Sequence, residues 1–231
     1  MRRITLLLFL LISISIQGQA QEREILTSDG VKLYVKVKGT GTPCLYLHGG
    51  PGSGSHWLEK FFGDYLEQHF QMIYLDQRGV CRSSSPKDNN YSLERMILDF
   101  EEVREALGIG EWLTLGHSFG GILQMAYSSQ KNDSIMNSSY RDIANWNNDF
   151  SAVALDVKEY WTDYTAKTPK VRVPVLFFYG YTDWMIGPKH YMNIRFPNMT
   201  LWGSDVGHIP FLENREDLEK AIDHYNAKHG F

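Results

Sequence analysis

Residues 116–120, GHSFG, have the G-x-S-x-G spacing that presents a serine on a tight turn between a strand and a helix. The apolar run 112–115 precedes the motif, and an apolar stretch of helical length, 120–127, follows it. Glycines two positions before and after the serine keep side chains from colliding in so tight a turn. An ordinary Ser-Gly turn would explain neither flanking element, so we predict that Ser118 is a nucleophile.

A serine nucleophile needs a base, and the base needs an acid that orients it. The expected chain order for this kind of turn is serine, acid, histidine. Asp183 comes just after the apolar run 173–179, and His208 follows a shorter apolar run. Both lie at carboxyl ends of predicted strands, where parallel sheets build their sites. We predict a triad of Ser118, Asp183 and His208; Asp205 is a rival acid, poorly placed to orient a ring three residues away.

A glycine-rich loop, residues 48–52 (HGGPG), directly follows the apolar run 44–47. Negative charge on a tetrahedral oxyanion is best stabilised by preorganised backbone N–H groups, and glycines let the backbone approach a substrate closely. We assign the N–H groups of Gly50 and Phe119 as oxyanion donors. Without the serine turn in the same chain, this sequence would indicate only a Gly/Pro turn.

The elements that must position these residues alternate between two patterns. Apolar runs typical of buried parallel strands occur at residues 44–47, 72–75, 112–115, 173–179 and 199–202. Apolar residues at three- and four-residue spacing predict helices over 57–70, 93–107 and 218–225. Ser92 can cap the second helix and Gly108 can end it, and Asp29-Gly30 predicts an N-terminal hairpin. The sequence therefore predicts an α/β fold with a mostly parallel sheet, helices on both faces and an antiparallel entry.

Residues 132–169 interrupt this alternation. Apolar residues within 153–164 fit a helix capped by Asp149 or Ser151, but the residues before them are polar and irregular. No run between 121 and 173 predicts a strand. We therefore expect one strand fewer in the second half of the sheet.

Five short segments together resemble one group of enzymes. They are HGGPG at 48–52, DQRG at 76–79, GHSFGG at 116–121, GYTD at 180–183 and GH at 207–208. The chain resembles the prolyl aminopeptidase (proline iminopeptidase) group of α/β-hydrolases over residues 24–130 and from 149 onwards. HGGPG with DQRG is fairly specific for that group, whereas the serine turn and triad are shared by the superfamily. The resemblance implies an α/β-hydrolase fold, the triad Ser118, Asp183 and His208, and a structural loop at 76–79 that Arg78 braces.

The chain departs from this group in its middle. The group carries a sixth strand after the serine helix and then a helical cap with acidic residues that hold the amino terminus of the substrate. Here we expect that strand and most of the cap to be missing, with 132–169 as a remnant cap segment. A missing strand would leave a gap of about 4.8 Å or let later strands slide inward, and a displacement of 1 Å can cost ~100-fold in rate. We therefore hypothesise that activity is impaired.

Residues 1–20 have the pattern of a cleavable signal peptide. Two arginines precede an apolar run at 4–16, and small residues at 18 and 20 favour cleavage before Gln21. The apolar run of 13 residues is too short to cross a hydrocarbon core of ~30 Å, so a membrane anchor is disfavoured. We expect a secreted or periplasmic protein with a single domain over residues 21–231.

Composition and motifs argue against several other classes of function. The formal charge is −4 and no Lys/Arg run is present, so nucleic-acid binding has little support. No HExxH motif, paired-Cys ligand spacing or phosphate-binding loop occurs, so we expect no metal or other cofactor. Cys44 and Cys81 are expected at opposite ends of neighbouring strands, which predicts two free thiols.

The chemistry predicted from these residues is acyl transfer by a serine hydrolase. The expected partner is a small substrate, with a peptide bearing an N-terminal proline or apolar residue as the first choice. A small ester or lactone is the enzymatic alternative, and a truncated relative that binds ligands without turnover is the non-catalytic one. Epoxide hydrolases and dehalogenases are disfavoured because they use Asp where Ser118 stands.

Overall fold

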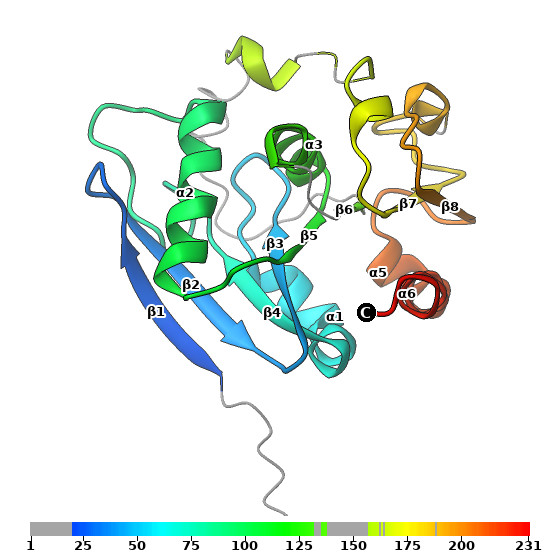
Figure 1. Cartoon of the computed structure of the whole chain (residues 1–231), viewed down its shortest axis with the longest axis horizontal. Coiled ribbons are helices and arrows are strands. Elements are labelled where there is room, and N and C mark those ends of the chain that lie inside the picture. Colours follow the sequence, from blue (N-terminus) through cyan, green and yellow to red (C-terminus); the bar gives the residue numbers. More distant parts are fainter. Residues whose placement is uncertain (1–19, 132–134, 138–156, 162, 164, 188) are drawn as a thin grey trace, which may run out of the picture.

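The computed structural model describes residues 20–131, 135–137, 157–161, 163, 165–187 and 189–231. Within these residues, one mixed sheet has the strand order β1-β2-β4-β3-β5-β6-β7-β8 (Figure 1). Its strands are β1 Gln21–Leu26, β2 Lys32–Lys38, β3 Thr42–Leu47, β4 Phe70–Leu75, β5 Leu113–Gly116, β6 Ile135–Asn137, β7 Val175–Gly180 and β8 Met199–Ser204. The β1–β2 and β2–β4 pairs are antiparallel and all the others are parallel. The predicted hairpin and mostly parallel sheet are confirmed.

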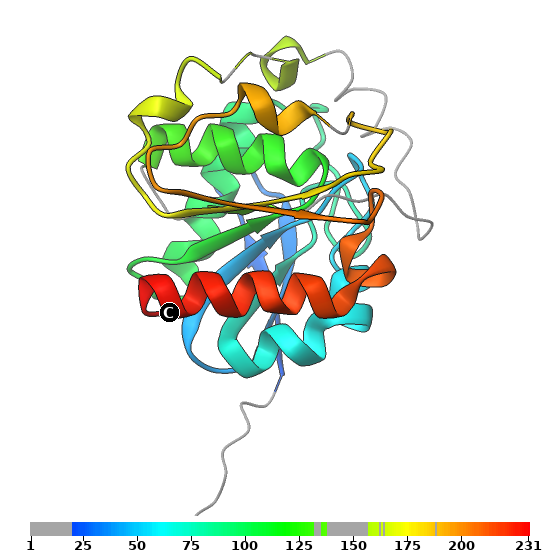
Figure 2. The same ribbon diagram turned by 90° about the vertical axis from the view of Figure 1, so that its right-hand side faces the viewer.

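Helices cover both faces of this sheet. They are α1 His56–His69, α2 Leu93–Ala106, α3 Phe119–Lys131, α5 Pro210–Glu213 and α6 Arg215–His229, with 3-10 turns η1 Lys158–Trp161, η2 Thr168–Lys170 and η3 His190–Asn193. The helices α2 and α3 pack on one face, and α1 and α6 on the other (Figure 2). As predicted, the Ser92 side chain accepts from the Arg95 N–H at the start of α2, and Gly108 follows its end with φ +68°.

Strand β3 shows why the central strands read as continuous apolar runs. Cys44 and Tyr46 belong to the hydrophobic core under α1 and α6, whereas Leu45 and Leu47 belong to the core under α2 and α3. Successive side chains of a strand point to opposite faces, so a strand covered on both sides is apolar throughout. All four side chains are buried. The two cores hold the carboxyl ends of the parallel strands at one edge of the sheet.

A strand lies between β5 and β7, where we expected none. Thr114 of β5 pairs with Ile135 of β6, and Ile135 pairs in turn with Val175 of β7. This strand has three residues in a polar sequence context, NDSIMNSS, so no local run of apolar residues marks it. It is held in the sheet by parallel pairing with β5 on one side and β7 on the other. The expectation that the sixth strand is missing was therefore wrong, and the predicted gap in the sheet does not arise.

The structure supports the prediction of two free thiols. Cys44 is buried and Cys81 is exposed, and neither is in a disulfide. Among the described helices, none has both the length and the apolar character needed to span a bilayer.

Two predicted segments lie largely outside the described residues. These are the signal peptide, residues 1–20, and the part of the 132–169 segment with the helix cap at Asp149 or Ser151. The described end of the second segment forms η1. There the Tyr160 ring packs edge-on against Phe119, with 4.9 Å between ring centroids, and its hydroxyl donates to the Tyr91 carbonyl oxygen. The chain after the middle segment is thus anchored on the first residue of α3.

Candidate active site

Ser118 lies on a sharp turn between β5 and α3. Strand β5 ends at Gly116 and α3 begins at Phe119. Ser118 has φ +54°, in the left-handed region that residues with a side chain rarely adopt. A bond of 2.8 Å from the Gly120 N–H to the His117 carbonyl oxygen closes the turn. The turn therefore holds a half-buried serine in a strained conformation at the carboxyl edge of the sheet.

The glycines of the turn are required because α3 approaches the ends of both β3 and β5 closely. A Cβ on Gly120 would lie 2.7 Å from the carbonyl carbon of Leu47 and 3.0 Å from the carbonyl oxygen of His48. A Cβ on Gly116 would lie 2.7 Å from the Gly120 carbonyl oxygen. The His117 N–H also donates to the Leu47 carbonyl oxygen at 3.0 Å. The first turn of α3 thus rests directly on the backbone at the end of β3.

The loops after β7 and β8 carry the predicted acid and base. The two strands run side by side (Figure 2), and their pairing continues beyond the sheet. The Tyr181 N–H donates to the Ser204 carbonyl oxygen at 2.9 Å, and the Thr182 N–H donates to the Val206 carbonyl oxygen at 3.1 Å. Gly180 ends β7 where a Cβ would lie 2.9 Å from the Val206 carbonyl carbon. The two loops are therefore held against each other.

The structure joins Ser118, Asp183 and His208 in one hydrogen-bonded chain. His208 Nδ1 lies 2.9 Å from Asp183 Oδ2 and 3.0 Å from Oδ1. His208 Nε2 lies 3.3 Å from Ser118 Oγ. A carboxylate only accepts, so the proton of the neutral ring is on Nδ1 and Nε2 is left to accept from the hydroxyl. This is the arrangement that activation of a serine requires.

Asp183, the acid of the hydrogen-bonded series, is buried and fixed by backbone donors. Asp183 is 1% exposed and His208 is 6% exposed. Asp183 Oδ1 also accepts from the N–H groups of Met185 and Ile186, each at 3.2 Å. Charge-assisted bonds of this kind fix the direction of a carboxylate. The rival acid, Asp205, is exposed on its loop.

His117 packs beside the triad as a neutral ring. Its centroid lies 6.3 Å from that of His208 and 5.5 Å from that of Phe211. Burial, with a smaller effect of the neighbouring His208, holds the pKa of His117 well below its ordinary value. At neutral pH, His117 therefore adds no positive charge next to the base.

The glycine-rich loop starts at His48, a buried residue that forms two hydrogen bonds with Gln77. His48 Nδ1 lies 3.0 Å from the Gly49 carbonyl oxygen, and Nε2 accepts from the Gln77 N–H at 3.1 Å. The Gln77 side-chain amide donates to the His48 carbonyl oxygen at 3.0 Å. Burial lowers the pKa of His48. The ring is therefore neutral and orients the loop through both of its nitrogens.

The two predicted oxyanion donors lie next to the serine turn in the chain trace. Leu47 pairs with Gly116 in the sheet, so the loop that contains Gly50 leaves the sheet beside this turn. Gly50 has φ +121°, and a Cβ there would lie 2.9 Å from the Ser53 nitrogen, so this position needs glycine. Phe119 is the first residue of α3. Their role as donors stays a prediction.

Asp76 ties the neighbouring loop to the start of α1. It accepts from the N–H and hydroxyl of Ser55 at 2.9 and 2.8 Å, and from Arg82 Nε at 2.6 Å. Burial alone would raise the pKa of Asp76, but these bonds and the arginine charge hold it below its usual value. The carboxylate is therefore ionised and structural.

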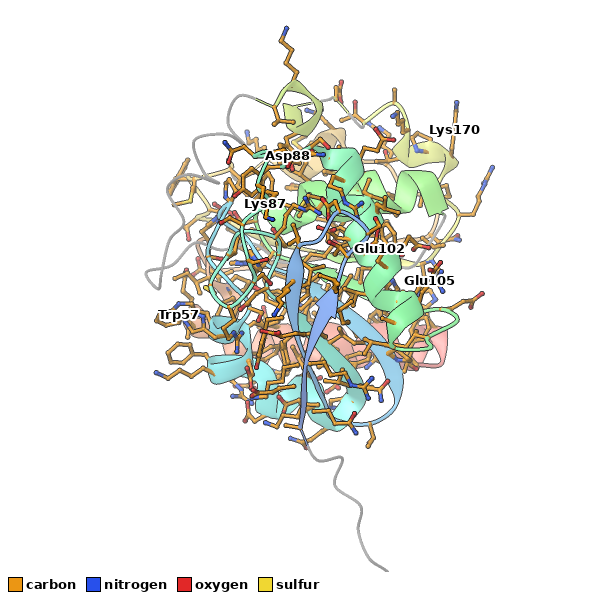
Figure 3. All side chains as sticks on the ribbon, turned by 90° about the vertical axis from the view of Figure 1, so that its left-hand side faces the viewer. Trp57, Lys87, Asp88, Glu102, Glu105 and Lys170 are labelled. Atoms are coloured by element: carbon orange, nitrogen blue, oxygen red, sulfur yellow. The ribbon has the colours of Figure 1, made fainter. Side chains whose placement is uncertain are left out.

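Arg78 lies at the centre of a buried ion cluster, in agreement with a bracing role. Its Nε and Nη2 donate to Asp99 at 2.6 and 2.8 Å, and Nη1 donates to Asp29 and to the Asn90 carbonyl oxygen, both at 2.9 Å. Burial opposes the charge of Arg78, but the two carboxylates raise its pKa above the usual value. Glu102 lies on α2 (Figure 3). It extends the cluster by accepting from the Ser28 backbone N–H at 2.8 Å.

Sequence reasoning missed two residues that hold parts of this site. Gln77 lies inside the DQRG motif, and only its contacts with His48 reveal its role. Glu213 accepts from the backbone N–H of Gly207 and, at 2.8 Å, from that of Ile209. A glutamate five positions after the histidine looks in the sequence like any surface residue at the start of a helix.

The described site offers a hydroxyl, an imidazole and a carboxylate, which suffice for acyl transfer. Within the ranges that the structure describes, no group of three or more His, Cys, Asp or Glu side chains is arranged to hold a metal ion.

Comparisons with known proteins agree with this architecture. A family model for the alpha/beta hydrolase fold matches residues 42–138. A hydrolase from Pseudomonas aeruginosa PA01 has a TM-score of 0.73 and 19% identity, with 90% of this chain and 98% of that chain covered. The esterase EaEST from Exiguobacterium antarcticum has a TM-score of 0.68 and 21% identity, with 89% and 99% covered. The chain therefore has the α/β-hydrolase fold.

Sequence similarity narrows this class. The proline iminopeptidase of Neisseria gonorrhoeae is 32% identical over 136 residues, which are 54% of this chain and 43% of that protein. The one from Saccharolobus solfataricus is 36% identical over 104 residues, 43% of this chain and 33% of that protein. The chain thus matches less than half the length of each of these relatives. Over these residues the chain is similar to proline iminopeptidases, the group that its motifs resemble.

Proposed function

We propose that this chain is a serine hydrolase that works through an acyl-enzyme. The observation that supports it most strongly is the path from Asp183 through His208 to Ser118, with 3.3 Å between His208 Nε2 and Ser118 Oγ. Catalytic hydrogen bonds are often this long before a substrate is bound and tighten in the complex.

In the proposed reaction, His208 takes the proton of Ser118 while Oγ attacks the substrate carbonyl carbon. The protonated ring then gives that proton to the leaving amine or alcohol as the scissile bond breaks. A water molecule attacks the acyl carbon in the second half, with His208 again as base, and Ser118 is released with its proton restored. Asp183 stabilises the protonated ring throughout.

The oxyanion of each tetrahedral intermediate needs two fixed donors. We propose the N–H groups of Gly50 and Phe119, because the loop and the helix start that carry them both adjoin the serine turn. Backbone donors in a partly buried site require no reorganisation as the charge develops.

The substrate class that we favour is a small peptide with an N-terminal proline or apolar residue, which would form the acyl group. Similarity to proline iminopeptidases supports this class, as do the HGGPG and DQRG motifs. A small ester or lactone would use the same triad and is the alternative. The predicted gap in the sheet no longer argues for impaired activity, because β6 pairs with both of its neighbours. That the shortened cap impairs activity stays a prediction.

A fluorophosphonate probe tests the mechanism directly. We expect rapid labelling of the wild type, loss of labelling in Ser118→Ala, and unchanged labelling in Ser85→Ala, which removes an exposed serine. An unlabelled wild type, or labelling that survives in Ser118→Ala, would contradict the proposal. Turnover of proline β-naphthylamide against p-nitrophenyl acetate then separates peptidase from esterase.

We also propose that residues 1–20 direct export and are removed. The first strand begins at Gln21, so cleavage before this residue would leave the sheet intact. N-terminal sequencing of the protein recovered from a secreting host should begin at Gln21. A retained Met1 on protein from the exported fraction would argue against cleavage.

A further inference from the structure

We infer that Glu213 is a positioning residue for His208, an inference that rests on the proposed function. Its carboxylate binds the two peptide N–H groups that flank the histidine. One oxygen, Oε2, accepts from Gly207, and the other, Oε1, accepts from Ile209 at 2.8 Å. The backbone on each side of His208 is therefore held by the same anion.

These two bonds hold the residues on either side of the base. Hydrogen bonds from backbone N–H to a carboxylate are about twice as strong as neutral ones. A Cβ on Gly207 would lie 3.0 Å from Glu213 Oε2, so the glycine before the histidine lets the carboxylate come close. The loop 207–209 is thus shaped around the Glu213 side chain.

Glu213 is itself fixed to the rigid part of the fold. Its N–H donates to the Ile209 carbonyl oxygen at 2.9 Å, which closes the short helix α5. Phe211, two residues earlier, is buried in the core under α1 and α6 and packs edge-on against His117. The Glu213 carboxylate therefore connects the loop 207–209, which carries His208, to the packed core of the protein.

The consequence for the reaction is geometric. The 3.3 Å between His208 Nε2 and Ser118 Oγ leaves little room for drift. A misplacement of about 1 Å can cost ~100-fold in rate. Without the Glu213 carboxylate, the two N–H groups would turn to water, and the histidine loop would keep its backbone bonds to the loop after β7 and to α5.

The test compares Glu213→Gln and Glu213→Ala with the control Glu216→Gln. Glu216 lies one turn further along, is exposed, and pairs with Lys220 at 2.7 Å. We expect fluorophosphonate labelling of Ser118 to slow about 10-fold in the Gln variant, which keeps one acceptor oxygen, and about 100-fold in the Ala variant. The control should label at the wild-type rate.

A second readout does not depend on activity. The Nδ1 proton of His208, bound to Asp183, should give a downfield proton NMR signal that disappears in His208→Gln. We expect this signal to broaden or vanish in Glu213→Ala, to shift in Glu213→Gln, and to persist in Glu216→Gln. If Glu213→Ala does not fold, the Gln variant supports the same two measurements.

The outcomes separate this inference from the proposed function. An unlabelled wild type whose NMR signal still depends on Glu213 would reject the hydrolase and keep the positioning role. A labelled wild type with unchanged labelling rate and NMR signal in the Glu213 variants would overturn the inference alone. Slower labelling that follows only a loss of folded protein, with the signal intact, would also overturn it.

Discussion

Replacing Gly120 by alanine would place a methyl group between the first turn of α3 and the end of β3. The new Cβ would lie 2.7 Å from the Leu47 carbonyl carbon and nearer still to its oxygen. Ordinary carbon–carbon contact begins at about 3.5 Å. Both partners are backbone atoms of the core, so neither can rotate away as a side chain could.

The helix must therefore move from β3 by about 0.8 Å or more to restore a normal contact. Ser118 lies two residues before Gly120 and moves with it, whereas His208 is held by a different pair of strands. Since a shift of 1 Å costs ~100-fold in rate, we expect labelling of Ser118 to fall between 10- and 100-fold. Overpacking should also cost about 1–3 kcal/mol of stability.

The labelling rate and urea unfolding, measured on the same preparations, test this reasoning. The matched control is Gly110→Ala, because a Cβ on Gly110 would meet nothing within 4 Å. Wild-type labelling and unfolding free energy in Gly120→Ala would refute the claim that this close approach sets the position of the nucleophile. Equal losses in both variants would point to a general effect of removing glycine.

Three further variants probe the site and its supports. Asp183→Asn should fold normally but label about 10⁴-fold more slowly, since an amide no longer holds His208 in the tautomer with its proton on Nδ1; a wild-type rate would remove Asp183 from the triad. Arg78→Met should lower the free energy of unfolding in urea by about 3–5 kcal/mol, because the buried carboxylate of Asp99 loses its main partner; a loss below ~1 kcal/mol would contradict this. Burial lowers the pKa of His117 in the folded protein, so below about pH 6.5 the unfolded chain binds a proton that the folded chain does not. The free energy of unfolding therefore decreases as the pH is lowered, by up to ~1.4 kcal/mol per pH unit. Urea unfolding between pH 7.5 and 5 should therefore show a shallower slope in His117→Gln than in the wild type, and equal slopes would mean that His117 is protonated when folded.

The serine turn and the sheet around it were predictable because local rules and tertiary structure agree there. Ser118 needs a left-handed backbone and glycines at fixed distances, which leave a signature in five residues. Four strands are buried on both faces, namely β3, β4, β5 and β7. Such strands consist of consecutive apolar residues, which can be recognised in the sequence. The order of Asp183 and His208 along the chain then followed from the topology.

Other parts could not be predicted because their cause is not local. The three residues of β6 are a strand only because β5 and β7 pair with them from both sides. Glu213 and Gln77 act through backbone groups of distant or neighbouring loops, and such contacts require no particular residue pattern. Hydrogen bonds from side chains to the main chain are therefore the part of this site that is hardest to predict from a single sequence.

The ion pairs of Arg78, the arginine of the DQRG motif, limit how far the amino terminus of this protein can be truncated. Asp29, one of the two anions that surround Arg78, comes from the tip of the first hairpin. A truncation that begins at β2 would leave a desolvated cation with half of its counter-charge. We expect the effect to extend to the adjacent Gln77 and, through its bonds, to His48 at the start of the glycine-rich loop. Truncations should therefore keep the hairpin of β1 and β2 complete, because its tip supplies the Asp29 counter-charge of Arg78.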